Sequence, residues 1–182
     1  MKIRAAIGFA AVTICILLAP ANAQTETKEL KAGAFQVVQE VILPASPEAA
    51  YDAATGDISG WWDHHISEHP KKLYIEAKPG GGFWEIFDDS GDGVLHATVT
   101  MAERGKILRF VGPLGLAGRA LEMVTTYEFW PDPAGTKLRV TCNVSGQIDD
   151  GLDKIVDAVW RHFIGEQLKA YIESGAYKNK KR

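Results

Sequence analysis

Cysteine is scarce in this sequence of 182 residues, which contains only Cys15 and Cys142. Because Cys15 falls in an apolar stretch close to the N-terminus, the rest of the chain has one cysteine and cannot form an intramolecular disulfide. A P-loop, a C-x-x-C pair and a recognisable Ser-His-Asp set are also missing, so no motif supports nucleotide-dependent or hydrolytic chemistry. The chain is slightly acidic, with a net charge of −3, which disfavours a nucleic-acid partner.

The first 23 residues have the pattern of a secretory signal peptide. Lys2 and Arg4 give a positively charged start, an uncharged apolar stretch follows, and Ala21-Asn22-Ala23 supplies small residues for a cleavage site. We expect cleavage after Ala23 and export to the periplasm or the exterior. We expect no stable membrane insertion afterwards, because the apolar stretch is shorter than the about 20 residues of a membrane span. Cys15 leaves a lipoprotein signal as the alternative.

The rest of the chain is predicted to form one domain over residues 35–175, between a polar leader at 24–34 and a basic, solvated tail at 176–182. A β-rich segment opens the domain, and two short helices are expected after it, one from Pro47 and one over 58–62. Turn-forming residues separate six further strands at 72–77, 82–87, 94–101, 107–111, 121–130 and 137–145. Because the links are too short for parallel crossovers, we expect an α+β fold with an antiparallel sheet of about seven strands.

The domain ends in a long amphipathic helix, predicted over 152–174. Its apolar residues recur with a 3.6-residue period and form one continuous face. At about 1.5 Å per residue the helix would be roughly 35 Å long, enough to cross a small antiparallel sheet. A curved sheet that closes on such a helix tends to enclose a cavity, which favours a binding function.

Alternation of apolar and polar residues predicts which side of a strand faces this helix. Apolar and polar residues alternate over 138–144, which places Leu138 and Val140 inside. In the strand at 94–101, His96 falls between inward positions, so we expect it on the outer face and without a chemical role. The inward residues of that strand are predicted to be Leu95, Ala97, Val99 and Met101.

Several motifs, taken in order, resemble the START-like or SRPBCC helix-grip superfamily. They are the Pro44–Tyr51 opening, the Trp61-Trp62 pair, the Gly80–Glu85 strand entry and the closing helix, and the likeness covers about residues 37–174. The sequence looks most like the activator of heat-shock-protein ATPase homologue branch (AHSA1-like), together with the polyketide cyclase branch. The resemblance implies a curved antiparallel sheet that grips the last helix around an apolar cavity. It does not imply one reaction, because such folds include lipid binders, hormone binders and cyclases.

Aromatic side chains supply most of the candidate ligand-binding residues. Trp61 and Trp62 follow the first helices, where the resembled fold has the mouth of its cavity, and could stack on a flat or apolar ligand. The alternative is that both only pack in the core. Gln167 interrupts the apolar face of the last helix and either contacts a ligand or reaches solvent. The candidate wall residues are Trp61, Trp62, Trp84, Phe110, Phe129, Trp160 and Phe163.

Glu85 is the candidate polar residue of the cavity. It alternates with Phe83 and Phe87, so it faces the cavity if they do. It faces solvent if Trp84 and Ile86 point inward instead, and the sequence leaves both orientations open. In an apolar pocket its pKa would rise, which suits a general acid or an anchor for a ligand hydroxyl or amine.

His65-Ile66-Ser67-Glu68-His69 matches the H-x-x-E-H pattern of inverted zinc proteases. Histidines four residues apart could share a helix face and bind a metal. However, Pro70 follows directly, no third ligand has a suitable spacing, and the resembled fold is different. We therefore expect no metal and no cofactor, and interpret the segment as a polar loop at the rim of the cavity.

The sequence favours an exported protein, without catalytic activity, that binds a small apolar, lipid-like or aromatic molecule in an internal cavity. The first alternative is a cyclase- or dehydratase-type enzyme with Glu85 as its acid or base. The second is an interaction module like the chaperone activators. Export speaks against that module, because the chaperone ATPase works with ATP inside the cell.

Overall fold

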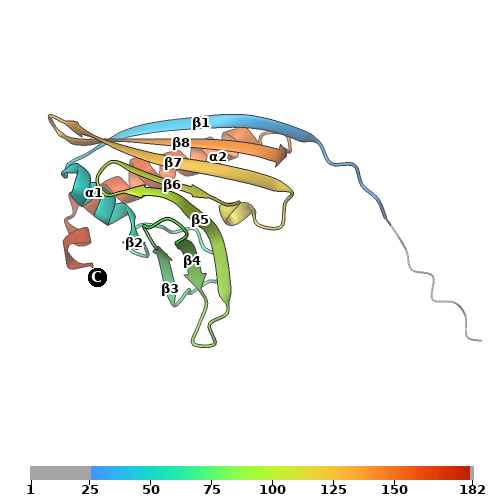
Figure 1. The fold of residues 1–182 in the computed structure, drawn as a ribbon, viewed down its shortest axis with the longest axis horizontal. Helices are drawn as coiled ribbons and strands as arrows, with labels where there is room; N and C mark the ends of the chain where they lie inside the picture. Colours follow the sequence, from blue (N-terminus) through green and yellow to red (C-terminus); the bar gives the residue numbers. More distant parts are fainter. Residues whose placement is uncertain (1–25, 181–182) are drawn as a thin grey trace, which may run out of the picture.

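The computed structural model describes residues 26–180, in which a curved sheet lies against a long C-terminal helix (Figure 1). The predicted signal peptide, its cleavage site at Ala23 and Cys15 lie outside the described residues. The predicted α+β fold with an antiparallel sheet is confirmed. Within the described range, no helix is both long enough and apolar enough to cross a bilayer.

The sheet has eight strands in the order β1-β8-β7-β6-β5-β4-β3-β2, and every neighbouring pair is antiparallel. The strand beyond the predicted seven is the two-residue β2. The first strand begins at Ala32, inside the segment that was expected to be a leader. The strands are β1 (Ala32–Leu43), β2 (Gly56–Asp57), β3 (Lys72–Ile75), β4 (Gly82–Ile86), β5 (Gly93–Glu103), β6 (Ile107–Val111), β7 (Leu121–Asp132) and β8 (Gly135–Gln147).

One short helix, α1 (Pro47–Ala54), follows β1 as predicted, and Ser46 caps it by accepting a hydrogen bond from the backbone N–H of Ala49. The second predicted helix, over 58–62, is a turn instead. In it the Ile58 carbonyl accepts the backbone N–H groups of both Trp61 and Trp62 at 3.1 and 2.9 Å. The two residues directly before this turn form β2, which pairs with β3.

A bulge between β4 and β5 reverses the predicted orientation around His96. Phe83 pairs with Ala97 and Trp84 pairs with Leu95, so His96 is an extra residue on β5. As a result Leu95 is 45% exposed, whereas His96 and Ala97 are both buried. The prediction that Leu95 faces inward and His96 outward is therefore wrong, because the extra residue shifts the alternation by one position.

A second irregularity in β5 moves Met101 to the outside. Val99 pairs with Phe110 of β6 and Met101 pairs with Arg109, which leaves Thr100 as the extra residue. Val99 remains buried as predicted, but Met101 is 39% exposed. The regular alternation of β8, by contrast, is confirmed, since Leu138, Val140, Cys142 and Val144 are all buried.

The C-terminal helix spans Leu152–Glu173, close to the predicted 152–174, but its middle is π-helical. It consists of α2 (Leu152–Trp160), a π-helical segment η2 (Arg161–Leu168) and α3 (Lys169–Glu173). In an α-helix each residue is rotated by about 40° around the axis relative to the residue four positions before it, and the wider π turn rotates it in the opposite sense. Buried side chains therefore recur at every fourth position, at Leu152, Val156, Trp160, Ile164, Leu168 and Ile172.

The apolar face of this helix is narrower than predicted, because Ile155 is 59% exposed. The basic tail is also not simply solvated. A short 3-10 helix, η3 (Ala176–Asn179), leads to Lys180, whose Nζ donates to the carbonyl oxygens of Asp52 at 3.0 Å, Ala53 at 3.4 Å and Thr55. These carbonyls lie at the C-terminal end of α1, where a cation interacts favourably with the last carbonyl groups of the helix.

Candidate functional site

A pocket of about 320 Å³ lies beneath the first half of the C-terminal helix. Strands β4, β5 and β7 supply its inner wall, and the loops after β2 and β6 supply its sides. Most of its walls are apolar, and its rim reaches the surface at Ile66 and Ile155, which are 55% and 59% exposed. The lining residues are Trp62, His64, His65, Ile66, Phe83, His96, Pro113, Leu114, Gly115, Leu116, Met123, Ile155, Val156, Val159, Trp160 and Phe163.

Trp62 organises the aromatic wall of the pocket. Its ring stacks on Phe163 of the π-helical segment, with centroids 3.8 Å apart and an interplanar angle of 20°. It also meets the edges of Phe83 and Trp160 at 5.0 and 6.1 Å. Its indole N–H donates to the His64 carbonyl oxygen at 2.8 Å, which fixes the ring. Trp62 thus joins the loop, the sheet and the helix at one point.

Glu85 and His96 form a buried hydrogen-bonded pair behind this wall. The His96 Nε2 lies 2.8 Å from Glu85 Oε2, and the two side chains are 6% and 0% exposed. Glu85 also accepts the backbone N–H groups of Ile66 at 2.9 Å and Ser67 at 2.7 Å. The inward orientation of Glu85, one of the two left open by the sequence, is therefore the one that the fold adopts. The carboxylate ties the loop after β2 to the sheet.

The surroundings of Glu85 favour its ionised form. Burial by itself raises the pKa of Glu85, but the backbone donors Ile66 and Ser67 and the hydrogen bond with His96 outweigh it and leave the pKa below its ordinary value. The raised pKa expected from an apolar pocket is therefore wrong, because three donors reach the carboxylate. Glu85 is thus placed to accept hydrogen bonds from these donors.

His96 is the residue of the site that the sequence reasoning missed. Its ring lines the pocket and meets the edge of Phe83 at 5.2 Å, and its Nδ1 is buried without a hydrogen-bond partner among the described residues. The irregular spacing that turns it inward is a bulge, which depends on the partner strand. Within the strand's own sequence His96 alternates with apolar residues as Thr98 and Thr100 do, so nothing there distinguishes it from them.

The predicted wall residues fall into two groups. Trp62, Trp160 and Phe163 meet in the pocket, and Glu85 reaches it through His96. The others do not line it. Trp61, Phe110 and Phe129 are buried in the surrounding core, Trp84 lies on the other side of β4 with its indole N–H on Glu76, and Gln167 lies 3.4 Å from His162 at a separate surface depression.

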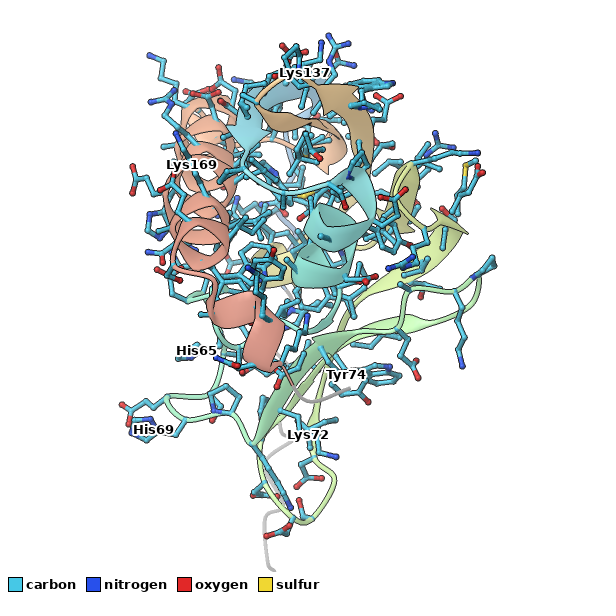
Figure 2. All side chains as sticks on the ribbon, turned by 90° about the vertical axis from the view of Figure 1, so that its left-hand side faces the viewer. His65, His69, Lys72, Tyr74, Lys137 and Lys169 are labelled. Atoms are coloured by element: carbon cyan, nitrogen blue, oxygen red, sulfur yellow. The ribbon has the colours of Figure 1, made fainter. Side chains whose placement is uncertain are left out.

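The H-x-x-E-H segment does not form a helix, and its residues do not form a metal site. His65 and His69 lie on an irregular loop, at the opposite end of the molecule from Lys137 (Figure 2). The His65 Nδ1 bonds to the Ser67 carbonyl oxygen instead. Among residues 26–180, no group of three or more His, Cys, Asp or Glu side chains has the geometry to hold a metal ion.

His162 connects this loop to the C-terminal helix at the rim of the pocket. Its Nε2 lies 2.7 Å from Asp63 Oδ2 and its Nδ1 lies 2.9 Å from Glu166 Oε2. The hydrogen bonds to Glu166 and Asp63 raise the pKa of His162. His64 packs between His162 and Phe163, with ring centroids 5.7 and 4.8 Å away.

The curved sheet, the long helix and the pocket between them define a helix-grip protein. The chain belongs to the Activator of Hsp90 ATPase homolog 1-like family, whose model matches residues 44–173. No curated protein matched the chain in sequence.

Solved structures with low sequence identity share this fold. A protein from Chromobacterium violaceum is 21% identical with a TM-score of 0.57, over 76% of this chain and 96% of that chain. An AHSA1-like protein from Aeromonas hydrophila is 18% identical with a TM-score of 0.56, over 81% and 99%. DynU16, a protein of the dynemicin biosynthetic locus, is 20% identical with a TM-score of 0.50, over 77% and 48%. At these identities the likeness shows the fold alone.

Proposed function

We propose that this protein is an exported binding protein that holds one small, mostly apolar molecule in the pocket beneath α2. The observation that carries the proposal is the pocket itself, with a volume of about 320 Å³ and aromatic walls from Trp62, Phe83, Trp160 and Phe163. This volume lies at the low end of the about 300–1,000 Å³ that is common for ligand sites. The family assignment supports the proposal, because helix-grip folds are known for ligand binding or for cyclase roles.

Export is the second part of the proposal, and it depends on the N-terminal pattern of charge, apolar stretch and small residues. N-terminal sequencing of the protein recovered from the periplasm or the medium should give Gln24 as the first residue. A protein that keeps Met1 and stays in the cytoplasm would contradict this part, and would return the chaperone-activator function to consideration.

The binding proposal is tested by a substitution on the helix that places a larger side chain in the pocket. Val159 lines the pocket, whereas Ala158, its neighbour on the same helix, is exposed. Calorimetric titration of the mature protein with a series of naphthalene derivatives should show binding. Val159→Phe should weaken it at least about tenfold, and the matched control Ala158→Phe should leave it unchanged. Equal affinities in both variants, or no binding by any probe, would contradict the proposal.

A cyclase- or dehydratase-type enzyme is the second candidate function, and the buried Glu85–His96 pair favours it. A carboxylate that orients an imidazole is a common arrangement for proton transfer. In this candidate the His96 ring would take the acid-base role that the sequence suggested for Glu85, because Glu85 already accepts three hydrogen bonds. If His96→Gln leaves every activity found for the protein unchanged, this candidate fails.

A further inference from the structure

The loop between β6 and β7 forms one side of the pocket, and only one of its residues is buried. Residues 113–118 connect the two strands and contain the short 3-10 helix η1 (Leu114–Leu116) (Figure 1). Leu114 lines the pocket and is 7% exposed, whereas the two glycines and the alanine that follow it in the loop are exposed. The loop therefore covers the pocket mainly through the side chain of Leu114.

The backbone of Leu114 has an unfavourable conformation. Its φ is +50°, and among residues 26–180 no other residue except glycine has a positive φ. In the left-handed region the Cβ of an L-residue lies too close to the following carbonyl oxygen, so this conformation persists only where the surrounding contacts impose it. At Leu114 that contact is the burial of its side chain in the pocket. Such strained residues cluster at ligand clamps and switch regions.

The two ends of this loop are fixed, but its middle has no polar contact with the rest of the domain. At one end Gly112 packs directly on β5, where a Cβ would lie 2.5 Å from the Cα of Ala97. At the other end the Ala120 carbonyl accepts the backbone N–H of Gln147 at 2.7 Å. Within the described part of the chain, the hydrogen bonds of residues 113–118 all stay inside the loop. The loop can therefore leave the pocket without breaking a hydrogen bond to the sheet or the helix.

We propose that Leu114 is a displaceable plug that limits the size of the ligand: small apolar molecules bind beside it, and larger ones bind only after the loop has moved it out of the pocket. This inference rests on the proposed binding function and names the residue that sets its size limit. Loss of the buried leucine surface opposes the displacement, and release of the backbone strain favours it. Because only the open fraction of the protein can bind a large ligand, the apparent affinity for that ligand is reduced by the same fraction.

The test compares two probes that differ in size but carry the same polar group. 2-Naphthol has two fused rings, 1-hydroxypyrene has four, and each has one hydroxyl. Fluorescence titration of the mature wild-type protein gives both affinities. A larger apolar surface by itself favours tighter binding. We expect the opposite order for the wild-type protein, with 1-hydroxypyrene the weaker ligand, because it must first displace Leu114.

Substitution of Leu114 should remove this penalty. Leu114→Ala and Leu114→Gly both shorten the plug, and should raise the affinity for 1-hydroxypyrene about five- to tenfold while 2-naphthol binds within about twofold of wild type. The matched controls are Leu95→Ala and Leu95→Gly, on an exposed leucine outside the pocket. They should leave both affinities unchanged.

The same four variants test the backbone strain. Glycine adopts a φ of +50° without strain and alanine does not, so Leu114→Gly should unfold at a higher urea concentration than Leu114→Ala. At Leu95, in a regular strand, the glycine variant should be the less stable of the two. If the order at Leu114 is the same as at Leu95, the backbone is not strained and the proposal is overturned.

The remaining outcomes separate the inference from the function beneath it. If 2-naphthol binds but the ratio of the two affinities is the same in wild type and in the Leu114 variants, Leu114 sets no size limit and the binding function stands. If neither probe binds to any of these proteins, both the binding function and the inference are overturned. If the Leu114 variants do not fold, the wild-type protein decides: weaker binding of 1-hydroxypyrene than of 2-naphthol supports the plug, and tighter binding overturns it.

Discussion

Glu85→Gln should strongly destabilise the protein, because one carboxylate holds the loop after β2 against the sheet. Glutamine has the same length and shape but offers one oxygen, and it brings an NH₂ group into a site that is lined by donors. The donors are the backbone N–H groups of Ile66 and Ser67 and the Nε2 of His96, all within 2.9 Å of the carboxylate. At least one of these loses its acceptor in the variant.

The expected loss follows from the number and kind of these bonds. A hydrogen bond to a charged group contributes about 1.5–3 kcal/mol. Because glutamine keeps one acceptor, we expect the free energy of unfolding to fall by about 3 kcal/mol. With a urea dependence of about 1–3 kcal/mol per molar, the unfolding midpoint should fall by about 1–3 M.

Urea unfolding followed by tryptophan fluorescence measures this change directly, since Trp62 packs on the same loop. The matched control is Glu122→Gln, an exposed glutamate on β7, which should change the free energy by less than about 0.5 kcal/mol. If Glu85→Gln is as mild as this control, the carboxylate does not hold the loop and the geometry argued for the site is wrong.

Glu85→Gln should also change how the free energy of unfolding depends on pH in acid. Since the pKa of Glu85 is lowered in the folded protein, its contribution is fully present above the unfolded pKa, near 4.5, and is lost as the pH falls through the folded pKa. The difference between wild type and Glu85→Gln should therefore be constant from about pH 6 to 7 and shrink below about pH 4. A difference that grows in acid would refute the assigned direction.

Two further predictions concern residues near the site. The Tyr127 hydroxyl is fully buried and without a partner among the described residues. Tyr127→Phe should therefore keep the free energy of unfolding in urea or raise it by up to about 1 kcal/mol, and a loss above about 1 kcal/mol would reveal a partner for the hydroxyl. His162→Gln should lower the melting temperature most at low pH. Because the pKa of His162 is raised in the folded protein, its contribution to stability is fully present below the unfolded pKa of 6.5 and is lost as the pH rises through the folded pKa. Melting curves from pH 5.5 to 8.5 test this, and a difference that widens with pH would count against the Asp63 and Glu166 contacts.

Local patterns were sufficient for most of the fold. The regular alternation in β8 and the 3.6-residue period of the last helix each lie within one segment, so they can be read without knowledge of its neighbours. The turn-forming residues between strands are equally local, and they gave the order of the elements. The candidate site was only partly predictable. Trp62, Trp160 and Phe163 lie in the pocket, while Trp84 and Gln167 do not.

The sequence by itself indicated the helix-grip family, the order of the elements along the chain and the need for an apolar surface beneath the last helix. Only the tertiary structure decided that Glu85 points inward, that its pKa falls instead of rising, and that His96 joins it at the pocket. The physical reason is that the bulge at His96 is a property of the register between β4 and β5, and the donors to Glu85 come from a loop 18 and 19 residues away. Such non-local contacts leave no periodic trace in either segment.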